Sequence, residues 1–159
     1  MRIIIVGAGK VGLALTQHLS GENQVTVIDQ NPQLIDNIIN IHDVMGVCGN
    51  GASYEVQKEA ETDKAELLIA TTSSDETNIV ACLVAKKLGV QHTIARIRNP
   101  EYEKQLRFMR EELGLSMSIN PEKATAREIA RVLRFPNAMK LESFSKGRLE
   151  LVEYRLPEK

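Results

Sequence analysis

The sequence has 159 residues, which is enough for one domain or for one domain with a short extension. Its hydrophobic fraction of 43% supports a buried core, and its formal net charge of −1 excludes a general electrostatic attraction to nucleic acid or to anionic membranes. Cys48 and Cys82 lack metal-type spacing, so we expect buried free thiols. The apolar run at the N-terminus is too short for a signal peptide or a membrane span, which predicts a cytoplasmic protein.

The first twelve residues carry the most informative motif. Residues 1–6 form an apolar run rich in Ile and Val that stops at a glycine, which is typical of a buried strand that enters a tight turn. Gly7, Gly9 and Gly12 then follow with the G-x-G-x-x-G spacing of dinucleotide-binding loops. The first glycine would permit the turn, the second would leave room for a pyrophosphate, and the third would let the helix at 10–20 pack closely. The free N–H groups of that helix would point at the phosphates.

A second predicted strand, residues 24–28, leads directly into Asp29. An acidic residue at this place accepts hydrogen bonds from ribose hydroxyls in Rossmann domains. Because a 2′-phosphate would be repelled and no arginine adjoins Asp29, the pattern favours NAD(H), or a nucleoside phosphate such as ADP or ATP, over NADP(H). The alternative is a simple glycine turn followed by a solvated carboxylate.

The rest of the chain alternates between predicted strands and helices. Further strands are expected at 44–48, 67–71, 93–97 and 116–119, and helices at 31–40, 52–60, 73–88, 100–113 and 121–134. This alternation predicts an α/β fold, a Rossmann-like, doubly wound parallel sheet of six strands with a helix at its C-terminal end. Residues 135–159 are expected to be extended or irregular, with a strand at 149–155.

The helix expected at 73–88 has two notable features. Ser73 and Glu76 have the spacing of a capping box that would begin it. Its stretch at 79–85 is nearly all apolar, so we expect the helix to be covered on more than one side.

Polar residues follow several of the predicted strands. In a doubly wound sheet the ligand lies at the carboxyl ends of the strands, where the strand order reverses. Asn50 would reach an adenine there, or would only form a turn with its two neighbouring glycines. Thr72 and Ser73 would bind ribose or phosphate, or would cap a helix. Arg96 lies in an apolar strand and fits either a buried salt bridge or a phosphate contact.

No catalytic arrangement accompanies these residues in the sequence. The nucleotide-binding pattern uses residues up to about 134 and leaves only residues 135–159 beside it. A nucleotide site without a neighbouring substrate region is typical of a sensor. The alternatives are an NAD-dependent oxidoreductase whose substrate site forms between subunits, and an assembly module with a vestigial cleft.

Four ordered blocks of the sequence carry a family resemblance. They are RIIIVGAGKVGLALTQHLSGENQVTVID, CGNGASYEVQKEA, ATTSSDETNIVACLVAKKLG and TIARIRNPEY, which lie between residue 1 and about residue 135. They resemble the TrkA-N domains, also called RCK or KTN domains, of potassium-uptake regulatory proteins. The resemblance implies a non-catalytic subunit that binds NAD(H) or adenine nucleotides. It also implies a homodimer that assembles into a tetrameric or octameric ring on a membrane potassium-translocating partner of the Trk or Ktr type, at the inner face of the cell membrane.

The resemblance further implies roles for individual residues. The phosphates would lie on the loop formed by Gly7, Ala8, Gly9, Lys10, Val11 and Gly12. The ribose would lie at Asp29 with Gln30 beside it, and the adenine near Asn50, Gly51 and Ala52. Thr72 and Ser73 would line the cleft, and Arg96 would contact a phosphate or the neighbouring subunit.

The end of the chain resembles the family's crossover, a segment exchanged between two subunits. Ala126, Ile129, Ala130 and Leu133 form an apolar stripe on the helix at 121–134, which would serve such an exchange or would cover the chain's own sheet. We therefore expect a nucleotide-binding domain at 1–134 and a crossover or linker at 135–159. The resemblance implies that this linker leads to a second ligand-binding domain, and we expect that domain to be absent or truncated here.

Overall fold

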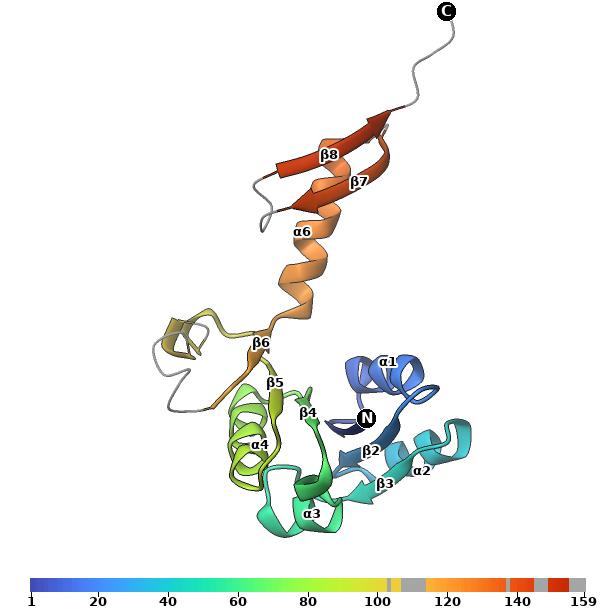
Figure 1. Ribbon diagram of the computed structural model, residues 1–159, viewed down its shortest axis with the longest axis vertical. Helices are drawn as coiled ribbons and strands as arrows, with labels where there is room; N and C mark the ends of the chain where they lie inside the picture. The colour runs from blue at the N-terminus through green and yellow to red at the C-terminus, as the bar shows by residue number, and fades with distance from the viewer. Residues whose placement is uncertain (103, 107–113, 137, 145–148, 155–159) are drawn as a thin grey trace, which may run out of the picture. The chain divides into compact units, whose positions relative to one another are not determined.

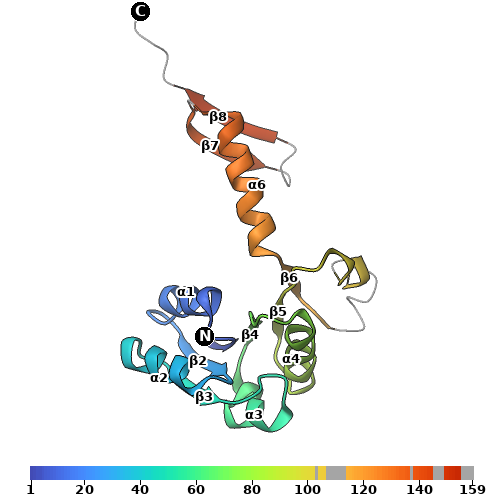
Figure 2. The ribbon, with the colours of Figure 1, turned by 180° about the vertical axis from the view of Figure 1, so that it is seen from behind.

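A computed structural model describes residues 1–102, 104–106, 114–136, 138–144 and 149–154 (Figures 1 and 2). These residues belong to two compact units, Met1–Asn120 and Pro121–Lys159. The division into a nucleotide-binding domain at 1–134 and a crossover or linker at 135–159 stays a prediction.

The first unit contains a parallel sheet of six strands. They are β1 (Arg2–Val6), β2 (Gln24–Asp29), β3 (Met45–Cys48), β4 (Leu67–Ala70), β5 (His92–Arg96) and β6 (Met117–Ile119). Their order is β3-β2-β1-β4-β5-β6, and every neighbouring pair is parallel. The predicted Rossmann-like α/β fold is thus confirmed. The order reverses between β1 and β4, which makes the carboxyl ends of these two strands the expected ligand-binding position.

Strand β1 lies between two hydrophobic clusters because its side chains alternate between the faces of the sheet. Ile3 and Ile5 belong to a cluster that includes residues of β2 and α2 (Pro32–Ile41). Ile4 and Val6 belong to a cluster that includes residues of β5 and α4 (Asp75–Lys87). All four side chains are at most 3% exposed. This double burial explains why β1 reads as a continuous apolar run.

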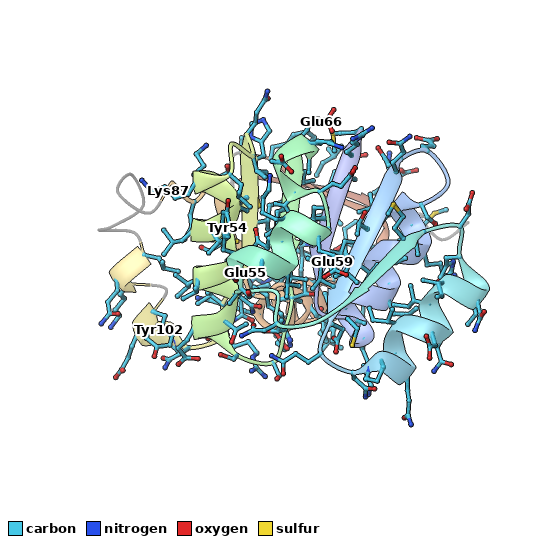
Figure 3. The ribbon with its side chains drawn as sticks, turned by 90° about the horizontal axis from the view of Figure 1, so that it is seen from below. Tyr54, Glu55, Glu59, Glu66, Lys87 and Tyr102 are labelled. Atoms are coloured by element: carbon cyan, nitrogen blue, oxygen red, sulfur yellow. The ribbon has the colours of Figure 1, made fainter. Side chains whose placement is uncertain are left out.

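Helices cover both faces of this sheet. Besides α2 and α4, they are α1 (Lys10–Leu19), α3 (Tyr54–Glu59) and a 3₁₀ turn at Thr62–Lys64. The outer surface of α3 carries Tyr54, Glu55 and Glu59, which Figure 3 labels. Residues 100–102 and 104–106 are also helical, and the rest of the helix predicted at 100–113 lies outside the described residues.

One of the two expectations for α4 is wrong. Ser74, not Ser73, caps the helix, since its hydroxyl oxygen accepts from the Thr77 N–H at 3.0 Å. Ser73 still belongs to the loop after β4, which shifts the start of the helix by one residue. The expected coverage of the apolar stretch on more than one side is found: α4 contacts α3 as well as β4 and β5, and within 79–85 Ala81 and Cys82 are fully buried while Val80 alone is exposed, at 43%.

The expectation that both cysteines are buried is wrong for Cys48. This residue ends the edge strand β3, and its side chain points away from the buried Val47, so it is exposed. Cys82 is buried in α4, and burial raises the pKa of its thiol to about 12. Cys82 therefore stays protonated and unreactive at neutral pH.

The second unit consists of α6 (Pro121–Arg134) and a hairpin of β7 (Ala138–Phe144) and β8 (Leu149–Tyr154). Helix α6 has the predicted bounds, and β8 confirms the strand predicted near the end of the chain. Residues 135–159 were expected to be extended or irregular without a strand near 138–144, and the structure makes this part extended as strand β7, whose backbone groups pair with β8. Among the described residues no helix is both long and apolar enough to cross a membrane.

Candidate functional site

A cleft of about 600 Å³ opens at the carboxyl ends of β1, β2, β4 and β5. It lies at the point where the strand order reverses, which is where Rossmann folds bind their ligands. Most of the predicted site residues line it, namely Gly7, Gly9, Lys10, Val11, Asp29, Gln30, Gly51, Thr72, Ser73 and Arg96. Ala8, Gly12, Asn50 and Ala52 are not part of its lining.

The three motif glycines differ in what surrounds them. Gly7 has a φ of +101°, and a Cβ at this position would lie 2.9 Å from the Thr72 nitrogen. A Cβ at Gly12 would lie 1.8 Å from the Gly7 carbonyl oxygen. A Cβ at Gly9, in contrast, would meet no atom within 4 Å. The fold itself therefore requires glycine at positions 7 and 12, whereas Gly9 leaves open space in the cleft lining.

Asp29 fixes the glycine-rich loop from the end of β2. One oxygen of its carboxylate accepts from the Ala8 N–H at 2.7 Å, and the other accepts from the Asn31 N–H at 2.8 Å. Each carboxylate oxygen keeps a second lone pair that a ligand hydroxyl can use. The bond to Ala8 is a role that the sequence does not reveal, because the two residues are 21 positions apart.

The segment after β3 favours the turn interpretation of Asn50. Its side-chain oxygen accepts from the Ala52 N–H at 3.0 Å, and its side chain is exposed. Gly51 is buried against β1, where a Cβ would lie 2.2 Å from Val6. Gln57 was not predicted, yet its fully buried amide donates to the carbonyl oxygens of Gly51 and Ala81, at 2.7 and 2.9 Å.

The opposite wall of the cleft comes from the loop after β4 and from the end of β5. Thr72, Ser73 and the half-buried Arg96 line it. Asn78 lies fully buried beneath this wall, and no sequence pattern predicted a role for it. Nearby, the Tyr102 hydroxyl donates to Glu76 at 2.7 Å and holds the pKa of that carboxyl below its usual value (Figure 3 labels Tyr102).

The chemistry of the cleft suits an anion that also carries hydroxyl groups. Lys10 and Arg96 supply positive charge, Asp29 supplies acceptor oxygens, and α1 begins at the loop with its free N–H groups. Within the described ranges, no group of three or more His, Cys, Asp and Glu side chains is placed to hold a metal ion.

The TrkA-N domain model matches residues 3–121 of this sequence. The chain belongs to the TrkA-N domain family. The Trk system potassium uptake protein TrkA homolog of Archaeoglobus fulgidus is 34% identical over 158 residues, which are 99% of this chain and 36% of that protein. Trk system potassium uptake protein TrkA of Vibrio alginolyticus is 36% identical over 156 residues, which are 96% of this chain and 34% of that protein. The chain thus spans about a third of the length of these TrkA relatives.

Solved structures of similar fold include other TrkA-N and RCK domains. The TrkA-N domain of the inner membrane protein ybaL from Escherichia coli has a TM-score of 0.71 at 23% identity, over 83% of this chain and 96% of that one. The GsuK channel bound to NAD has a TM-score of 0.62 at 22% identity, over 74% of this chain and 21% of that one. At these identities the likeness shows the fold alone.

Proposed function

We propose that this TrkA-N domain binds NAD(H) in the cleft and thereby regulates a Trk-type potassium uptake system. ADP or ATP is the alternative ligand. The observation that carries the proposal is the position of the glycine-rich loop and Asp29, which meet in one cleft where the strand order reverses. The domain acts in this account by binding a nucleotide and not by converting it.

Each part of the cleft has a role in this proposal. The phosphates lie on the N–H groups of the loop from Gly7 to Gly12, where the bare backbone at Gly9 permits close approach. Lys10 and Arg96 offset the phosphate charge. The ribose hydroxyls donate to Asp29, which keeps NADP(H) out because its additional phosphate would face a carboxylate. The adenine lies toward Gly51.

The biological setting is inferred from the relatives. Two of them are named as TrkA proteins of potassium uptake, and one similar structure is a channel bound to NAD. We infer that the domain forms a homodimer within a tetrameric or octameric ring. This ring would be cytoplasmic and attached to a membrane potassium-translocating subunit.

A nucleotide regulates such a ring only through its differential affinity for two conformational states. A tenfold preference for one state supplies about 1.4 kcal/mol per site, and the sites of one ring add. This is enough to shift an equilibrium between two hinge angles without any chemical step.

A thermal-shift panel of NAD, NADH, NADPH, ATP, ADP and cyclic dinucleotides tests the proposal. A ligand that binds only the folded chain raises the unfolding midpoint. At a free ligand concentration of one hundred times the dissociation constant, it adds about 2.7 kcal/mol to the unfolding free energy. We expect NAD or NADH to give the largest shift, with ADP and ATP next. The largest shift from NADPH would contradict the role of Asp29, and no shift from any nucleotide at high concentration would favour a vestigial cleft.

A further inference from the structure

Asn78 is a fully buried amide near the start of α4, directly beneath the wall of the cleft. Its Nδ2 group donates to the carbonyl oxygens of Thr72 at 3.2 Å and of Arg96 at 2.9 Å. Its Oδ1 atom accepts from the Thr72 N–H at 2.8 Å and from the Thr72 hydroxyl at 2.7 Å. The amide thus makes two donor and two acceptor bonds, and it ties the loop after β4 to the end of β5.

This arrangement fixes the direction of the Thr72 hydroxyl. The carbonyl oxygens of Thr72 and Arg96 can accept only from the NH₂ group of the amide. The amide oxygen must therefore face the N–H and the hydroxyl of Thr72. The Thr72 hydroxyl proton then has two acceptors, Asn78 Oδ1 at 2.7 Å and the Ser74 carbonyl at 3.1 Å, and both belong to the protein. One lone pair of the hydroxyl accepts from the Ser74 N–H at 3.3 Å, which leaves the other for the cleft.

We propose that Asn78 is a positioning residue that presents Thr72 to the cleft as a hydrogen-bond acceptor for a sugar hydroxyl. A phosphate offers acceptor oxygens, which a lone pair of Thr72 cannot bind, whereas a ribose hydroxyl donates. The inference rests on the proposed function and narrows it, because it assigns this wall of the cleft to a sugar and not to a phosphate.

The rest of α4 supports a positioning role. Asp75, three residues earlier and also buried, accepts from the N–H groups of Arg98 and Asn99 at 2.9 and 2.8 Å, so it holds the same segment after β5. Later buried positions of the helix, such as Ala81 and Ala85, are small and apolar. A buried amide is costly unless every group is paired, and an apolar residue would pack there without that requirement. The buried polar residues of α4, Asp75 and Asn78, thus lie only in its first turns, next to the cleft wall, as a positioning role requires.

The test uses four variants of the full chain. Asn78→Leu removes all four hydrogen bonds, and Thr72→Val removes the hydroxyl while Thr72→Ser retains it. Thr93→Val is the matched control, because Thr93 is also fully buried and its hydroxyl donates to the Gly114 carbonyl at 3.3 Å, at the other end of β5. Dissociation constants for NAD and ADP are measured by calorimetry, and unfolding midpoints by circular dichroism.

We expect Asn78→Leu and Thr72→Val to weaken binding of the preferred nucleotide about tenfold or more, and Thr72→Ser and Thr93→Val to stay within about twofold of the unchanged chain. Unchanged affinity in Thr72→Val would overturn the inference, even if Asn78→Leu does not fold. Equal weakening in Thr93→Val and Asn78→Leu would overturn it as well, because affinity would then follow stability alone. If the unchanged chain binds neither nucleotide, the proposed function itself fails.

Discussion

At the scale of single residues, the three motif glycines separate the requirements of the fold from those of the ligand. The Cβ of Gly12→Ala would overlap the Gly7 carbonyl oxygen, at 1.8 Å. We expect this variant to lose about 3 kcal/mol or more of unfolding free energy, because the backbone of α1 cannot move away from β1 without disrupting the core. Urea denaturation followed by circular dichroism measures the loss.

Gly9→Ala is the matched substitution at the ligand side of the same loop. No atom lies within 4 Å of the added methyl group, so we expect the unfolding free energy to change by less than about 1 kcal/mol. The methyl group would instead occupy the space proposed for the pyrophosphate and weaken NAD binding at least about tenfold. Normal affinity in Gly9→Ala would mean that the phosphates do not approach this backbone.

Residue types and spacing predicted the loop and the carboxylate but not the amides behind them. Gly7 to Gly12 and Asp29 can be located in the sequence because their roles depend on local conformation and on the ends of strands. Gln57 and Asn78 form bonds across 6 to 24 positions in the sequence, and no local pattern marks them. Such long-range polar contacts appear only once the fold brings the elements together.

At the scale of helices and strands, two serine substitutions test which residue caps the start of α4. Ser74→Ala should lower the unfolding free energy by about 1 kcal/mol, because it removes the acceptor of the Thr77 N–H. Ser73→Ala, one residue earlier and exposed, should stay within about 0.5 kcal/mol of the unchanged chain. The reverse ranking in chemical denaturation would restore Ser73 as the cap.

Sequence patterns locate well the elements that show a clear apolar run or a clear capping residue. Strands β1 and β2 are buried on both faces and stand out as apolar runs, and Asn31 begins α2 as predicted, accepting from the Gln33 N–H at 3.0 Å. Strand β7 does not stand out, because it is stabilised by pairing with β8 and not by a buried face of its own. The exposure of Val80 on α4 likewise depends on which neighbours the helix meets.

At the scale of the whole molecule, the proposed ring requires contacts between copies of the chain. Helix α6 exposes large apolar side chains, with Ile129 at 55%, Val132 at 51% and Leu133 at 72%. We expect light scattering to give at least twice the chain mass of 17.7 kDa at micromolar concentration. Leu133→Lys should shift this mass toward that of the single chain, because a charge would be buried at the contact.

Glu128→Gln is the control for that substitution, since Glu128 lies on the same helix outside the apolar stripe and its partner Arg131 is also on α6. It should leave the mass unchanged, because the Glu128 side chain is 58% exposed and an ion pair with a solvent-exposed partner contributes little. A single-chain mass for the unchanged protein at all concentrations would contradict assembly through α6.

The sheet as a whole was predictable because parallel strands joined by helices have few allowed orders. The six strands and their alternation with helices follow from apolar periodicity, and the reversal between β1 and β4 then sets the place of the cleft. The assembly is not predictable in the same way, since it depends on surfaces whose partners lie outside this chain.

The most direct test of the central claim is a crystal structure of the chain grown with NAD. The account predicts the pyrophosphate on the backbone of Gly9 and Lys10, and a ribose hydroxyl within hydrogen-bond distance of the Asp29 carboxylate. Dinucleotide density elsewhere, or an empty cleft at saturating NAD, would contradict it.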